Sequence, residues 1–148
     1  MEFFPQVELS RNAAEAIARG LYAVAKSDGL HEKEAGLIAS FWLDTGGSSA
    51  DLSDLERGAT AKPEEIAAAL HTAEEKDLFL KTAILLAYAD GQVTAAERQT
   101  LGQFGSALGI DATKLGQLEA GVKDFLLGHL THLQNTDALQ SVVKKLGV

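Results

Sequence analysis

Residues 77–108, DLFLKTAILLAYADGQVTAAERQTLGQFGSAL, decide the expected fold. The segment from Leu78 to Ala89 is apolar on most sides, and a helix of this kind is normally buried inside a domain. It is too short and too interrupted to span a membrane. Asp90-Gly91 predicts a helix stop, because glycine readily takes the left-handed conformation that ends helices. Thr94-Ala95-Ala96-Glu97 then matches the capping box that starts a helix, so the stretch predicts two helices joined by a sharp turn.

The same pattern occurs earlier in the chain, in residues 21–41, LYAVAKSDGLHEKEAGLIASF. Asp28-Gly29 corresponds to Asp90-Gly91, and Glu34 corresponds to Glu97. The first turn is one residue shorter, since Glu34 follows Asp28 by six positions while Glu97 follows Asp90 by seven. An internal repeat of this kind indicates two copies of one supersecondary unit, which usually pack about an approximate two-fold axis.

Length and composition favour one helical domain. The chain has 148 residues, which is enough for a single domain with a substantial core. Its hydrophobic fraction of 46% argues against disorder. Abundant Ala and Leu with only two prolines favour helices over strands. We therefore predict an all-α fold, a single compact domain over residues 1–148, with seven to eight helices. Two pseudo-symmetric helix, Asp-Gly turn, helix repeats lie within it, at about 11–43 and about 75–108.

Local signals place most of the helix boundaries in the first half. Ser10 can cap a first helix that ends at the first Asp-Gly turn. Residues 45–49, TGGSS, predict a flexible loop by composition. Pro63 suits the first position of a helix whose apolar stripe continues to Ala73. We expect the central helix to begin near Glu75.

The last third of the chain is less regular. Gly109 and Asp111 predict a helix stop followed by a new cap. Three glycines, Gly116, Gly121 and Gly128, argue against one straight helix after that cap. We expect a final short helix with Asn135 as its cap.

Charge and cysteine content exclude several classes of function. The net charge is −8, which disfavours non-specific nucleic-acid binding because such binding needs clustered Lys and Arg. The chain has no cysteine, so disulfides and thiolate metal sites are excluded. The opening residues lack the pattern of a signal peptide, and we expect a cytoplasmic protein.

The carboxylates at the two turns are the candidate functional residues: Asp28, Glu32, Glu34, Asp90 and Glu97. Carboxylate oxygens are the ligands that Ca²⁺ and Mg²⁺ prefer, so the two turns could form a shared cation site. The alternative is that the Asp-Gly pairs and Glu97 are only helix stops and caps. Neither turn has the ligand spacing of an EF-hand.

Catalytic motifs are absent from the sequence. It has no GxSxG, no HExxH, no phosphate-binding glycine loop and no RNA-binding aromatic motif. We therefore expect that the protein is not an enzyme.

The paired turns, VAKSDGLHEKE at 24–34 and LAYADGQVTAAE at 86–97, resemble those of the TerB-like family, the helical domains associated with tellurite resistance. The resemblance runs from about Arg11 to Val122 and includes LGID at 108–111. It implies an all-α fold of two similar halves. It also implies a role in tellurite resistance or a wider stress response, often within membrane-associated or multi-protein complexes, without a defined biochemical activity.

The resemblance also implies an acidic surface that binds metal. Asp28, Glu34, Asp90 and Glu97 occupy the motif positions. Because the first turn is one residue shorter, Glu32 is a second candidate for the role of Glu34.

Two hypotheses remain open at the level of sequence. The first is a non-catalytic cytoplasmic stress-response module whose two Asp-Gly turns hold a divalent cation, Ca²⁺ or Mg²⁺. The second is a protein-interaction scaffold that binds a basic or helical partner, with turns that are purely structural. Both predict a protein partner, and that partner could belong to a membrane complex with which the chain associates peripherally. Neither hypothesis specifies the partner or the oligomeric state.

Overall fold

The computed structural model describes residues 8–27, 29–30, 32–88 and 93–133, with side chains described up to residue 126. These residues form α-helices and no strand, which confirms the all-α prediction. The seven described helices are α1 (Arg11–Lys26), α2 (Glu32–Asp44), α3 (Ser49–Arg57), α4 (Pro63–Ala69), α5 (Ala73–Ala87), α6 (Ala95–Ala107) and α7 (Ala112–Leu133).

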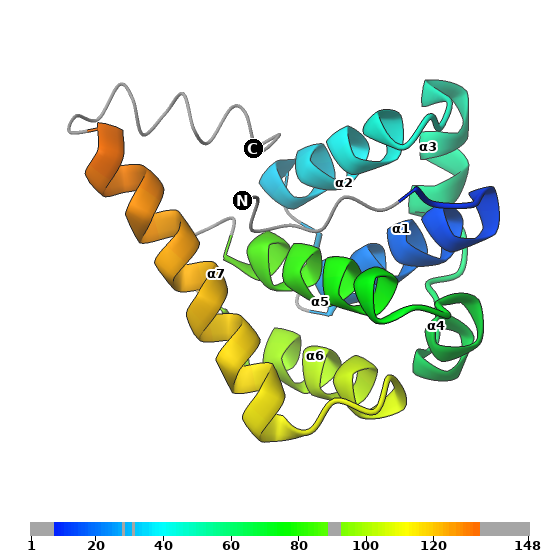
Figure 1. The fold of residues 1–148 in the computed structure, drawn as a ribbon. Helices are drawn as coiled ribbons and strands as arrows, with labels where there is room; N and C mark the ends of the chain where they lie inside the picture. The colour runs from blue at the N-terminus through cyan, green and yellow to red at the C-terminus, as the bar shows by residue number, and fades with distance from the viewer. Residues whose placement is uncertain (1–7, 28, 31, 89–92, 134–148) are drawn as a thin grey trace.

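Helices α1 and α5 form the centre of the core. α1 packs against every helix from α2 to α6, and α5 packs against α1, α2, α6 and α7 (Figure 1). On the inner face of α1, Ile17 and Leu21 are fully buried. On α5, burial extends to most sides of the helix, with Leu80 and Leu86 also inaccessible to water. The sequence prediction of a buried helix in this stretch is therefore confirmed.

One aromatic pair fixes the approach of α6 to α5. The rings of Phe79 and Phe104 meet edge to face, with centroids 5.3 Å apart. Gly20 on α1 allows this pair to sit close, because a Cβ atom there would lie 2.7 Å from the ring of Phe79. The small residue on α1 is thus required by the packing of a ring on α5.

The local caps read from the sequence are confirmed where the structure describes them. The Ser10 side chain accepts a hydrogen bond from the N–H of Ala13 at the start of α1. Pro63 is the first residue of α4. Gly109 takes the left-handed conformation, with φ of 79°, and Asp111 accepts from the N–H of Lys114 at 2.8 Å just before α7.

Two boundaries differ from the prediction. The helix that begins at Pro63 ends at Ala69 and does not continue to Ala73. The central helix begins at Ala73, two residues before the expected start at Glu75, because Thr72 and Glu75 form a capping box there. The apolar stripe crosses this boundary without a break, so hydrophobic spacing alone did not reveal it.

The glycine-rich stretch near the end is one helix rather than several pieces. α7 runs without interruption from Ala112 to Leu133, alongside α5 and α6 (Figure 1). Leu118 and Val122 are buried against the core, and this tertiary packing outweighs the low helix propensity of glycine. The predicted final helix with Asn135 as its cap lies outside the described residues.

The loop at 45–49 is more closely packed than its composition indicates. The indole N–H of Trp42 donates to the carbonyl of Ser48 at 2.8 Å. Gly47 lies so close to the Trp42 ring that a Cβ atom would come within 2.2 Å of it. Ser48 then caps α3 through the N–H of Ala50. The glycine serves close packing here rather than flexibility.

Candidate functional site

The two Asp-Gly turns each join a pair of helices. α1 leads through the first turn into α2, and α5 leads through the second into α6. Asp28 and Asp90 themselves lie outside the described residues, as does Gly91. Gly29 is described, and its φ of 97° is the left-handed conformation expected at a helix stop.

Glu34 and Glu97 occupy the same position in their helices. Each is the third helical residue after its turn, because α2 begins at Glu32 and α6 begins at Ala95. Both side chains are 0% exposed, whereas Glu32 is exposed to solvent. The structure therefore places Glu34, and not Glu32, in the position equivalent to Glu97, despite the shorter first turn.

Glu97 closes the predicted capping box with one of its two oxygens. The N–H of Thr94 donates to Glu97 Oε1 at 2.9 Å, and the N–H of Glu97 donates to the Thr94 hydroxyl at 3.1 Å. The other oxygen, Oε2, is buried, and no described residue donates a hydrogen bond to it. Buried carboxylate oxygens are normally paired with a donor or a cation.

Capping alone does not explain this burial. Glu75 forms the same box with Thr72 at the start of α5, and its side chain stays partly exposed. Its Oε1 accepts from the N–H groups of His71 and Thr72 at 2.8 and 3.0 Å. These donors, that of Thr72 most strongly, hold the pKa of the Glu75 carboxyl below its usual value. A capping glutamate can therefore work at the surface, so the complete burial of Glu97 needs another reason.

The two buried glutamates lie on helices that are not packed directly against each other. Within the described part of the chain, the backbones of α2 and α6 do not pack against each other, and α1 and α5 pack against both. No three His, Asp or Glu side chains in that part group closely enough to hold a metal ion. Glu34 and Glu97 thus lie on two different helices, each near the start of the helix that follows its turn.

A cluster around Glu119 adjoins the second turn, and sequence reasoning missed it. Tyr88 follows the last residue of α5, and its hydroxyl donates to Glu119 Oε1 at 2.7 Å. Arg98 on α6 contacts both oxygens of Glu119, each at 2.8 Å. The Lys123 ammonium lies 5.7 Å from the Tyr88 ring centroid. Arg98 and Tyr88 are 21 and 31 positions away from Glu119 in the chain, so no local sequence motif predicts the cluster.

This network shifts the acidity of its members. The hydrogen bond from Arg98, followed by that from Tyr88, holds the pKa of Glu119 below its usual value despite partial burial. Burial, with the hydrogen bond to Glu119 second, raises the pKa of the Tyr88 phenol. Glu119 is therefore an anion, and Tyr88 a donor, over the physiological pH range.

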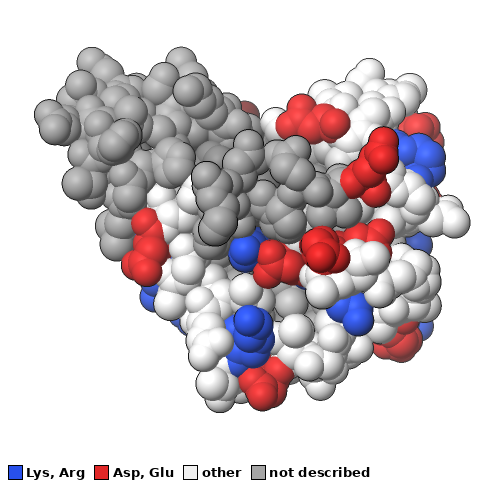
Figure 2. All heavy atoms as spheres, in the orientation of Figure 1, with Lys and Arg blue, Asp and Glu red and all other residues white. Residues whose placement is uncertain are grey.

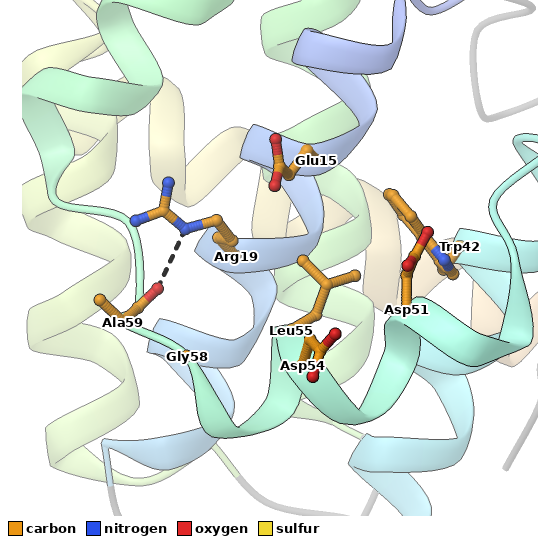
Figure 3. Close-up of a pocket in the computed structure, with 8 residues that line it drawn as sticks. All are labelled: Glu15, Arg19, Trp42, Asp51, Asp54, Leu55, Gly58 and Ala59. Carbon is orange, nitrogen blue, oxygen red and sulfur yellow. Dashed lines mark hydrogen bonds between the residues drawn. The ribbon is translucent and has the colours of Figure 1, made fainter.

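A hollow of about 420 Å³ opens between α1, α2 and α3 (Figure 3). Its polar groups are partly paired within the chain. Arg19 donates to the carbonyl of Ala59 at 3.0 Å, and Asp54 forms an ion pair with Arg57 at 3.2 Å. The hollow is lined by Glu15, Arg19, Trp42, Asp51, Asp54, Leu55, Gly58 and Ala59.

A second groove, of about 520 Å³, is mostly apolar. Leu80, Leu108, Ile110 and Leu118 contribute its apolar walls, from α5, α7 and the end of α6. Leu43, at 48%, is the only large apolar side chain in the described part of the chain that is well exposed to solvent. On the face in Figure 2, acidic and basic groups are interspersed over the described residues.

Comparison with protein-family models, curated proteins and solved structures finds no match for this chain. None of the described helices is both long enough and apolar enough to cross a lipid bilayer. Resemblance to the TerB-like family thus rests on the residues of the two turns.

Proposed function

We propose that the chain is a non-catalytic, TerB-like stress-response module of the cytoplasm that binds a divalent cation, Ca²⁺ or Mg²⁺, at its Asp-Gly turns. The observation that carries the proposal is the buried Oε2 of Glu97, to which no described residue donates. A divalent cation supplies the positive charge that such an oxygen lacks, and carboxylates suit Ca²⁺ and Mg²⁺. Asp90 is the motif partner of Glu97 in this role.

We infer one cation at each turn rather than a single shared cation, because the two glutamates are equivalent positions on different helices. Glu34 is the third residue of α2 and is as fully buried as Glu97. The two glutamates belong to helices whose backbones do not pack against each other among the described residues. We assign Asp28 and Glu34 to the first site, and Asp90 and Glu97 to the second. The pairing of α1 with α2 and of α5 with α6 supports the two-repeat arrangement.

The protein would use the cation for structure and signalling rather than for chemistry. A bound cation fixes the geometry of the turn and offsets the charge of the buried carboxylate. The lowered pKa values of Glu75 and Glu119 are explained by a helix cap and by an ion pair with Arg98, without any catalytic role.

A ¹H–¹⁵N NMR titration of chelator-treated protein with Ca²⁺, Mg²⁺ and Mn²⁺ tests the proposal. We expect saturable changes at the amides of Gly29 and Gly91. Glu97→Gln should remove the response at Gly91 and keep the response at Gly29. Glu75→Gln, the matched change in a surface capping box, should keep both. The absence of a localised response at millimolar cation in the wild type would overturn the proposal and leave the turns as helix stops.

A protein-interaction scaffold is the second candidate function. The apolar groove lined by Leu80, Leu108 and Leu118 is the observation that favours it, because helical partners bind in such grooves. The apolar side chains of the groove present little surface to solvent, because Leu43, which is not in the groove, is the only well-exposed large apolar side chain among the described residues. A protein that binds no cation but whose groove amides shift when a partner is added would favour this function.

A further inference from the structure

Glu119 joins the chain on both sides of the second Asp-Gly turn. Tyr88 stands just before the turn and Arg98 stands in the first turn of α6, and both bind the same carboxylate on α7. The two hydrogen bonds and the second ion-pair contact of Arg98 are short, at 2.7 to 2.8 Å. The carboxylate therefore fixes the distance between the end of α5 and the beginning of α6.

The first turn has a different connection. Lys26, the last residue of α1, donates to the backbone carbonyl of Glu56 on α3. The Ser27 hydroxyl donates back to the carbonyl of Val24 within its own helix. Among the described residues, the hydrogen bond from the flanks of the first turn to α3 comes from Lys26 and reaches a backbone carbonyl, whereas one carboxylate on α7 binds side chains from both flanks of the second turn.

We infer that α7 is the responsive element of the second turn: cation binding there strengthens the docking of α7 through Glu119, and loss of that docking weakens cation binding. This inference rests on the cation site proposed above. Glu97 and Arg98 are neighbours in the sequence. A cation bound to Glu97 therefore constrains the same turn of α6 that the ion pair between Glu119 and Arg98 constrains. Two constraints on one distance reinforce each other, because the second orders a segment that the first has already ordered.

The coupling must be reciprocal. If the cation tightens the docking of α7 by some factor, then docking of α7 tightens the cation by the same factor. Couplings between sites in proteins are typically about 5- to 150-fold. We expect a value near the lower end, since Arg98 is 53% exposed in its pair with Glu119.

Three variants of the full chain separate the contributions. Glu119→Gln removes the ion pair with Arg98. Tyr88→Phe removes only the hydroxyl and keeps every charge, so it tests the link without altering the electrostatic attraction for the cation. Asp54→Asn is the matched control, because it removes a carboxylate from an exposed ion pair with Arg57, far in the chain from the turn. Circular dichroism establishes that each variant keeps its helix content.

The measurements are the Ca²⁺ dissociation constant and amide hydrogen exchange over residues 112–126, with and without Ca²⁺. In the wild type, saturating Ca²⁺ should slow exchange in this segment severalfold. Glu119→Gln should weaken Ca²⁺ binding about fivefold and abolish the slowing of amide exchange by Ca²⁺. Tyr88→Phe should weaken Ca²⁺ binding less and reduce the slowing only in part. Asp54→Asn should match the wild type in both measurements.

The outcomes distinguish this inference from the cation site on which it rests. A wild type that binds Ca²⁺ at Gly91 without any change of exchange in residues 112–126 would overturn the inference and leave the site intact. If Glu119→Gln and Tyr88→Phe both kept the wild-type affinity for Ca²⁺, the inference would also be overturned and the cation site would stand. A wild type with no cation response at either turn would overturn the proposed function, and the inference with it.

Discussion

Replacing Glu97 by Gln should have opposite consequences with and without cation. The amide keeps an oxygen for the Thr94 N–H, and Gln is accepted at this position of a capping box. In chelator, the change also removes a charge from a side chain that is 0% exposed. We therefore expect the metal-free variant to be within about 1 kcal/mol of the wild type, or more stable.

With cation present, the variant should be less stable than the wild type. At a free cation concentration of 100 times the dissociation constant, one site stabilises the folded state by about 2.7 kcal/mol. For a chain of this size, 1 kcal/mol shifts Tm by about 2–4 °C. Glu97→Gln should therefore lose roughly 5–10 °C of the rise in Tm that cation gives the wild type.

Thermal melts followed by circular dichroism, in chelator and in saturating Ca²⁺, measure both effects. Glu75→Gln is the control, since Glu75 has the same cap geometry at a partly exposed position, and it should behave like the wild type. A loss of about 3–5 kcal/mol in chelator, together with no Ca²⁺ effect on the wild type, would refute the reasoning. That result would mean that the protein itself pairs the Glu97 carboxylate.

Three further predictions concern packing and pH. Gly20→Ala should destabilise the protein by about 1–2 kcal/mol in urea unfolding, because the new Cβ would lie 2.7 Å from the buried Phe79 ring. Gly102→Ala, with nothing within 4 Å, should stabilise it by about 1 kcal/mol, and equal effects of both changes would contradict the packing argument. Glu119 has a depressed pKa in the folded state, so its stabilisation is complete above its unfolded value and is lost as pH falls through the folded value. Glu119→Gln should cost about 1 kcal/mol at pH 7 and flatten the loss of stability below about pH 4.3, and an unchanged acid slope would exclude a role for the pair with Arg98.

Local signals in the sequence were enough to predict most of the helix ends. The Ser10 cap, Pro63 at a first position and the Gly109 stop each depend on side-chain and backbone geometry within about four residues. The same kind of signal was present at Thr72 and Glu75, where the apolar stripe misled the prediction of the helix start.

Tertiary contacts account for what sequence reasoning missed. The continuity of α7 depends on Leu118 and Val122 packing against helices that are distant in sequence, which overrides the preferences of the intervening glycines. The contacts of Glu119 with Tyr88 and Arg98 likewise depend on how α7 lies against α5 and α6. The sequence did single out Glu34 and Glu97 as equivalent positions, and the structure adds that both are buried.

The central position of α1 has a consequence for synthesis of the chain. This helix is covered by the adjacent α2 and, as extensively, by α5, and the end of α5 is about 60 residues beyond the end of α1. Ribosomes add about 5–20 residues per second, so α1 leaves the ribosome roughly 3–12 s before α5 is complete. During that interval Ile17 and Leu21 can pack only against the helices already made, so part of the apolar face of α1 stays exposed on the nascent chain, where a chaperone would recognise it.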